Sequence, residues 1–235
     1  MSIEDASAFE TPFEYVRTKV KPERDKVRNK LEKELWWIHG RPGPDLRKSL
    51  QKINRYIATS RVSKHRTFVF IDAKTLPDNA VVIIARDDHY IFGVVQSRPH
   101  LVWALEIGTS LEDRPRYSQT LTFETFPFPW VPGSEPVDDP RVQAIGAAAK
   151  ELVEMRERWL NPTPSQPPPN PKNGDLGEGP RRTLTNLYNA RPTWLDLAHK
   201  RLDAAVFAAY GWPVDLSDDE ILERLLRLNL ERAGK

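Results

Sequence analysis

Positive charge gathers in the segment RVSKHR, from Arg61 to Arg66, directly before an apolar run. Arginine and lysine neutralise phosphates, while serine and threonine hydroxyls donate hydrogen bonds to phosphate oxygens. Arginine can also donate to both major-groove acceptors of guanine. The mixture predicts a loop that contacts nucleic acid, and the alternative is a solvated basic surface. The candidate contacts in this loop and in the segment before it are Arg55, Thr59, Arg61, Ser63, Lys64, His65 and Arg66.

A second candidate loop reads GTSLEDRPRYS, from Gly108 to Ser118. Glu112 could accept a hydrogen bond from cytosine N4 while Arg114 or Arg116 donates to guanine. An acid and a base two residues apart can thus read both halves of a G·C pair. The alternative is a local surface salt bridge, which contributes little stability. The remaining predicted DNA contacts are Arg98 and Tyr117.

Charge is unevenly distributed along the chain. The whole sequence carries 35 Lys and Arg against 33 Asp and Glu, a formal net charge of +2. Between Glu14 and Arg66, however, 16 lysines and arginines stand against 6 acidic residues, so the rest of the chain is mildly acidic. This asymmetry suggests a polyanionic partner on one face, although a solvated, lysine-rich helix would have the same composition.

The chain carries no recognisable catalytic motif. Its five histidines lack a metal-ligand spacing such as HExxH, there is no GxSxG elbow, and none of the 11 glycines belongs to a phosphate-binding array. An alternative is a metal-dependent nuclease that uses Asp45, Asp72 and Lys74, because such a site needs two carboxylates and a lysine around a divalent ion. Helix capping also explains Asp45. We expect no catalysis, metal or cofactor on this chain.

Cysteine is absent, which excludes disulfides and thiolate metal sites. No apolar run approaches the ~18 residues that a membrane span needs. The opening MSIEDASAFE is acidic and lacks the apolar core of a signal peptide. These features predict a cytoplasmic protein.

Four runs rich in Ile, Val, Phe and Tyr must position the two loops. RYIAT, RTFVFID, AVVIIARD and YIFGVVQS are typical of strands, and LPDN and RDDH between them are typical of turns. HLVWALEIG predicts a short helix that ends at Gly108, and RYSQTLTFETF predicts a last strand. Residues 51–135 are therefore expected to form a recognition domain with a mixed β-sheet and flanking helices.

A helical lead-in is expected over residues 1–50. A loose apolar stripe predicts one charged helix from Thr11 to Glu34, and the bulky pair Trp36 and Trp37 follows it. Together with the sheet, this segment indicates the α+β class.

Helices are also expected after the sheet. Asp139 and Pro140 are typical of a helix start and predict a helix over residues 136–160. Residues 181–235 are predicted to form a C-terminal helical hairpin that must bury its apolar stripe. The end signals of its two helices are an N-cap at Thr193, a stop at Gly211 and a capping box of Ser217 and Glu220.

The segment between these helices, residues 161–180, is rich in proline, glycine and asparagine. Such a composition cannot build a core and predicts a linker or an exposed loop. A protein-interaction module that uses this Pro-rich linker is a further alternative function.

Three segments in this order carry a family resemblance: RYIATSRVSKHRTF, VVQSRPHLVWA and RYSQTLTFETFPFPW. They resemble the target recognition domain of MmeI-like (type IIL) restriction–modification enzymes and related adenine-specific DNA methyltransferases. The C-terminal NLYNARPTWLDLAHKRLDAAVFAAYGWPVDLSDDEILERLLRLN resembles the helical tail that follows this domain. TFETFPFPW and AYGWP are the most specific motifs, and the resemblance covers most of the chain.

This resemblance implies a sequence-specific DNA recognition module that is not catalytic alone. Full-length members bind S-adenosylmethionine in a methyltransferase domain with an Asn-Pro-Pro-aromatic motif, and some add a nuclease; neither methyltransferase motif is present here. The chain would then be the C-terminal part of such an enzyme, with double-stranded DNA and a methyltransferase domain or subunit as partners. The resemblance also implicates Glu112 and Arg114 in base choice and places Arg61 to Arg66 in the other recognition loop.

Overall fold

The computed structural model describes residues 1–40, 43–111, 114–162 and 182–234. The chain divides into two compact units, Met1–Ser49 and Leu50–Lys235. Among the described residues, no helix is both long and apolar enough to span a membrane.

The first unit is a set of short helices. Their bounds are α1 (Ile3–Ser7), α2 (Glu10–Tyr15), the π-helical η1 (Val16–Val20), α3 (Lys21–Arg24), α4 (Lys30–Glu34) and α5 (Pro44–Leu50), the last of which crosses the unit boundary.

The predicted single helix from Thr11 to Glu34 is wrong, because the chain leaves the helix after Arg24. Asn29 restarts it as the N-cap of α4, where its side chain accepts from Leu31 N at 3.0 Å. Asparagine favours such caps because its side chain competes for backbone donors.

The tryptophan pair closes a small core in this unit. Trp36 is buried, and its ring centroid lies 5.4 Å from that of Phe13 and 5.9 Å from that of Trp37. The apolar patch at the end of the lead-in therefore packs within its own unit.

The second unit contains a three-stranded sheet with β1 (Arg55–Ser60) between β2 (Val69–Asp72) and β3 (Val81–Ile84). Both pairings are antiparallel, and Ile57 lies opposite Phe70 on one side and Ile84 on the other. The α+β class is confirmed. The sheet is not mixed, however, since every pairing within the described residues is antiparallel.

The run YIFGVVQS is not a strand but belongs to helix α6 (His89–Gln96). The Asp88 carboxylate caps this helix by accepting from Ile91 N at 2.7 Å. Every residue from Tyr90 to Gln96 is buried, so the helix is surrounded by the core on all sides. Periodicity cannot separate such a helix from a central strand, which is why the sequence misled.

The run RYSQTLTFETF is also not one long strand. Helix α7 (Arg98–Ile107) leads into a two-stranded ribbon of β4 (Thr109–Leu111) and β5 (Arg114–Arg116), and the π-helical η2 (Gln119–Phe123) follows. The Thr122 hydroxyl donates to the Ser118 carbonyl and accepts from Ser118 N at 3.2 Å. These side-chain bonds to the backbone satisfy groups that a strand would have used in its ladder.

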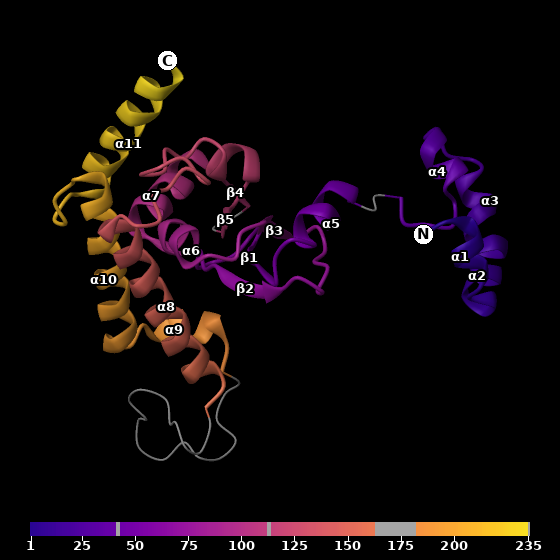
Figure 1. Cartoon of the computed structure of the whole chain (residues 1–235), viewed down its shortest axis with the longest axis horizontal. Coiled ribbons are helices and arrows are strands. Elements are labelled where there is room, and N and C mark those ends of the chain that lie inside the picture. The colour runs from indigo at the N-terminus through magenta and orange to yellow at the C-terminus, as the bar shows by residue number, and fades with distance from the viewer. Residues whose placement is uncertain (41–42, 112–113, 163–181, 235) are drawn as a thin grey trace. The chain divides into compact units, whose positions relative to one another are not determined.

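Four helices complete the second unit: α8 (Pro140–Leu160), α9 (Leu184–Ala190), α10 (Thr193–Tyr210) and α11 (Asp218–Ala233). Helix α8 packs on both α6 and α10, and α11 packs on α7 (Figure 1). The two terminal helices thus bury their apolar faces on different partners, α10 mainly on α8 and α11 mainly on α7, and not mainly on each other as a hairpin. The sheet and helices α6 to α11 share one hydrophobic core.

The predicted helix ends are largely confirmed. Asp139 caps α8, Gly211 ends α10 at a φ of 70°, and Ser217 with Glu220 forms the capping box of α11. Thr193 is the first helical residue of α10, one position after the N-cap residue Pro192. Most of the predicted linker, residues 161–180, lies outside the described residues.

Candidate nucleic-acid interface

Arg66, the last residue of the basic segment, points into the protein. It is only 8% exposed, and its guanidinium donates to Thr59 Oγ1 at 3.1 Å and to the Ser60 carbonyl. Its Nη2 donates to the carbonyl oxygen of Pro115 at 2.9 Å. Burial lowers the pKa of Arg66 to about 10, so the side chain remains charged at neutral pH. This cation therefore joins β1 to β5.

Thr59 and Tyr117 are buried beside Arg66. The Thr59 hydroxyl donates to the Thr67 carbonyl at 2.8 Å, and the Tyr117 hydroxyl lies 3.1 Å from His100 Nε2. Burial raises the pKa of Tyr117 and lowers that of His100 to about 3, so both side chains are neutral at pH 7. Their internal partners favour a supporting role for these two predicted contacts.

The backbone brings the two predicted loops together. Val62 forms an antiparallel bridge with Arg116, and Tyr117 N donates to the Arg61 carbonyl at 2.7 Å. The loop after β1 is therefore hydrogen-bonded to the C-terminal end of β5. The sequence proposed both segments but carried no signal of this pairing.

Three predicted cations at this junction are exposed: Lys64, Arg114 and Arg116. Arg61 is half-buried, and its Nε donates to the Asn79 carbonyl at 3.0 Å. Solvent can therefore reach positive charge on both segments, although Arg66 has turned inward. Glu112 lies outside the described residues.

The turn inside the basic segment is closed locally and held from a distant helix. The Ser63 hydroxyl donates to the His65 carbonyl at 2.8 Å. Lys64 Nζ and His65 Nε2 both lie within hydrogen-bond distance of Asn189 Oδ1 on α9, at 3.0 Å and 2.8 Å. Sequence reasoning missed Asn189, because nothing local to α9 marks it.

Arg55 and Arg98 have internal partners of their own. Arg55 lies 3.7 Å over the Phe70 ring and donates to the Asp87 carbonyl at 3.0 Å. Arg98 donates to Asp218 Oδ1 from Nε at 2.9 Å and from Nη2 at 2.6 Å. These contacts tie β1 to the start of α6 and α7 to α11.

A buried polar network supports the start of β2 next to the basic segment. Arg156, on α8, donates to the Phe68 carbonyl at 2.7 Å and to Gln96 Oε1 at 3.3 Å. Gln96 Oε1 also accepts from Phe68 N at 2.8 Å. Sequence reasoning missed both side chains, although an arginine within the apolar stripe of residues 140–160 was a usable signal.

Two residues of the nuclease alternative, Asp72 and Lys74, form a local turn. Asp72 Oδ1 accepts from Lys74 N at 2.8 Å, which closes a turn after β2. Across the described ranges, no group of three His, Cys, Asp or Glu side chains could hold a metal ion.

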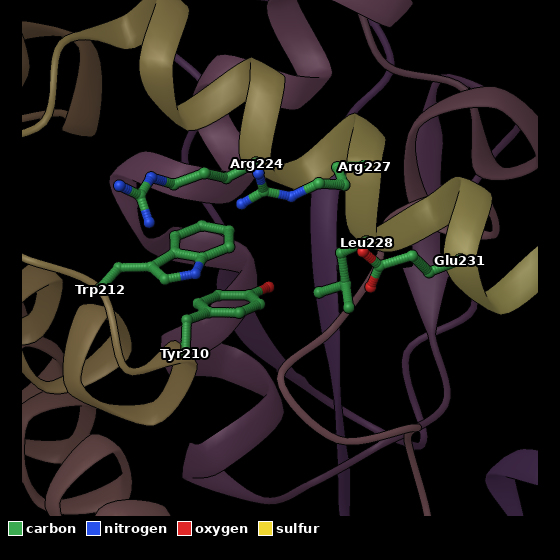
Figure 2. A pocket seen from close by; sticks show the side chains of 6 residues that line it. All are labelled: Tyr210, Trp212, Arg224, Arg227, Leu228 and Glu231. Carbon is green, nitrogen blue, oxygen red and sulfur yellow. The ribbon is translucent and has the colours of Figure 1, made fainter.

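A groove of about 450 Å³ lies between the end of α10 and the face of α11 (Figure 2). Tyr210 and Trp212 stack at 4.2 Å on one side of it, and the Arg224 guanidinium lies 5.9 Å from the Trp212 ring. The Tyr210 hydroxyl donates to the Pro127 carbonyl at 2.9 Å. The groove thus marks where the motif AYGWP holds the motif PFPW, and no predicted DNA contact lines it. Its lining residues are Tyr210, Trp212, Arg224, Arg227, Leu228 and Glu231.

Three comparisons with known proteins agree with this architecture. Residues 19–130 match the family model for the MmeI target recognition domain. DNA methyltransferase A of Bacillus subtilis (strain 168) is 29% identical over 213 residues, which are 88% of this chain and 20% of that protein. The type IIL restriction–modification enzyme MmeI, solved in complex with DNA, has the same fold, with a TM-score of 0.68 at 22% identity over 93% of this chain and 26% of that one. The chain thus spans about a quarter or less of the length of both relatives.

Proposed function

We propose that the chain reads a specific sequence of double-stranded DNA on behalf of a larger enzyme, because residues 19–130 match the family model for the MmeI target recognition domain. One structural observation supports the proposal beyond this family match. The bridge between Val62 and Arg116 joins the two segments that the sequence nominated as DNA contacts.

Joining the segments concentrates exposed positive charge. Lys64, Arg114 and Arg116 are exposed, and all three lie on segments that Arg66 and the backbone hold together. A polyanion with regularly spaced phosphates is the partner that such a surface favours. A duplex also offers base edges within reach of side chains on the same surface.

The buried residues are assigned a positioning role, and the exposed residues are assigned contacts with DNA. Arg66, Thr59 and Tyr117 hold the loop after β1 against the ribbon, so we assign them a positioning role in place of direct contact. Lys64, Arg61 and Arg116 supply phosphate contacts. Base choice is assigned to Arg114 with its neighbour Glu112, together with Ser63 and His65 at the turn. Arg55 and Arg98, which have internal partners, support the elements on either side.

The larger enzyme is proposed to be an adenine-specific DNA methyltransferase, alone or combined with a restriction nuclease. The chain corresponds to 20% of a relative that is named a DNA methyltransferase. S-adenosylmethionine binding and methyl transfer to a flipped adenine would then belong to a separate methyltransferase domain or subunit. Such an enzyme acts on DNA in the cytoplasm, in keeping with a chain that has no cysteine.

A selection from random duplex DNA tests the proposal. The full chain is incubated with the pool at moderate salt, and the retained duplexes are sequenced. We expect an enriched motif, and we expect Glu112→Ala/Arg114→Ala to relax it at one base pair. Glu157→Ala/Arg158→Ala is the matched control, because it also removes one acidic and one basic side chain, both exposed on α8.

Each outcome of the selection has a definite meaning. A motif that relaxes only in the Glu112/Arg114 variant places that loop in the groove. Retention of all sequences equally, with a strong dependence on salt, would show that the basic segments hold phosphates without reading bases and would overturn the proposal.

A further inference from the structure

Asn189 lies outside the residues that match the target recognition domain, yet its side chain contacts the basic segment, Arg61 to Arg66. Its Oδ1 lies 3.0 Å from Lys64 Nζ and 2.8 Å from His65 Nε2. The contact joins residues that are more than 120 positions apart in the sequence.

The chemistry of the three side chains fixes the direction of both hydrogen bonds. A lysine ammonium has donors only, so the Asn189 atom that faces it must be the carbonyl oxygen. The same oxygen can only accept from His65, so Nε2 of the imidazole must carry a proton. Asn189 therefore favours the form of His65 that is protonated at Nε2 and orients the Lys64 ammonium.

Helix α9, which carries Asn189, is anchored to α10 by its buried Tyr188. The adjacent Tyr188 is buried, and its hydroxyl lies 2.9 Å from Nε2 of the buried His199 on α10. Burial lowers the pKa of His199 to about 4, so the ring is neutral at pH 7. The centroid of the His65 ring lies 6.0 Å from that of the Tyr188 ring, so His65 also packs near this anchored tyrosine.

We propose that Asn189 is a positioning residue for sequence reading: it holds Lys64 and His65 in the conformation that meets DNA. The inference rests on the proposed function and extends it to the helical tail. A loop that is already ordered loses less conformational entropy on binding, so its affinity is higher. The effect is largest when the loop must fit one base sequence closely. Contacts with phosphates alone need no single loop conformation, so affinity for DNA of any sequence depends less on this ordering.

The test compares a cognate duplex from the selection with a scrambled duplex of the same length. Asn189→Ala removes the acceptor, Asn189→Asp keeps it, and Thr185→Ala alters an exposed residue of the same helix. We expect Asn189→Ala to lower the ratio of cognate to scrambled affinity about 5- to 10-fold, with an unfolding midpoint close to that of the wild type. We expect Asn189→Asp to keep the ratio, although its added negative charge weakens both duplexes alike, and Thr185→Ala to change neither.

A double-mutant cycle identifies the contact responsible. We expect His65→Ala/Asn189→Ala to lose less affinity for the cognate duplex than the product of the two single losses, because one interaction is removed twice. Multiplicative losses would show that Asn189 does not act through His65.

Three results would overturn the inference, and they differ from one another. An unchanged ratio in Asn189→Ala, while the wild type still enriches a motif, removes the role of Asn189 and leaves the proposed function standing. Equal losses on both duplexes with a lowered unfolding midpoint indicate a structural role only. Failure of the wild type to enrich any motif removes the proposed function and this inference together.

Discussion

The guanidinium of Arg66 donates to the carbonyl oxygen of Pro115 across 2.9 Å. Arg66 belongs to the segment after β1, and Pro115 belongs to β5. This contact turns an arginine of phosphate-binding type into the link between the two segments that the proposed function needs on one surface.

Replacing Arg66 by lysine should destabilise the fold. Lysine keeps the charge but cannot bond Thr59, Ser60 and Pro115 at once, because it lacks the planar fork of donors. We expect the free energy of unfolding to fall by about 2 kcal/mol, as buried acceptors lose a charged donor. Urea denaturation measures the change, and Lys64→Arg at an exposed position is the control. Equal stability of the two variants would mean that Arg66 is not a structural link.

Lys64 and Arg116 should affect how DNA binding responds to salt. Each phosphate contact contributes about 0.9 to the slope of log K against log salt concentration. Lys64→Ala and Arg116→Ala are each expected to make the slope shallower by about that amount. Titrations at several salt concentrations give the slopes. Arg158→Ala should leave the slope unchanged, and a similar change in that variant would show that only net charge matters.

Two glycines in the packed helices should respond to alanine in opposite ways. A Cβ at Gly93 would lie 2.7 Å from Ile145 Cγ2, so Gly93→Ala forces α6 away from α8 and should cost about 1–3 kcal/mol. A Cβ at Gly146 would meet nothing within 4 Å, and alanine there should stabilise the helix by about 0.5–1 kcal/mol. Thermal or urea unfolding of both variants checks this. A tolerated Gly93→Ala would contradict the close packing of the two helices.

Asp203 should make stability depend on pH. Its side chain accepts from Arg98 N at 2.7 Å, and burial raises its pKa to about 6. Because the folded pKa lies above the ordinary value of 3.8, the stabilising contribution is complete below about pH 4 and is lost as the pH rises through about 6. We expect this loss to be about 2–3 kcal/mol.

Asp203→Asn isolates that contribution, since asparagine can still accept from Arg98 N but does not titrate. Unfolding free energies of the variant and the wild type are compared at pH 4, 5, 6 and 7. The wild type should lose stability relative to the variant across this range. Parallel pH profiles would show that Asp203 titrates normally in the fold.

The sequence by itself determined most helix ends in the second unit and the positions of the first three strands. Asp139, Gly211 and the pair Ser217 and Glu220 were read correctly, because a cap is a contact between residues at most a few positions apart. Residue type also identified the two candidate segments, because the hydrogen-bond donors of arginine, lysine and serine are known from the sequence alone.

The tertiary structure decided the rest, because burial and long-range pairing have no local signature. YIFGVVQS became a helix when packing surrounded it on every side. Arg66 became an internal link only because β5 lies beside the loop after β1. Asn189 reaches Lys64 and His65 because the chain returns to the sheet more than 120 residues later. Which side chains are exposed is therefore decided by the packing of the fold, whereas the kinds of side chain available are set by the sequence.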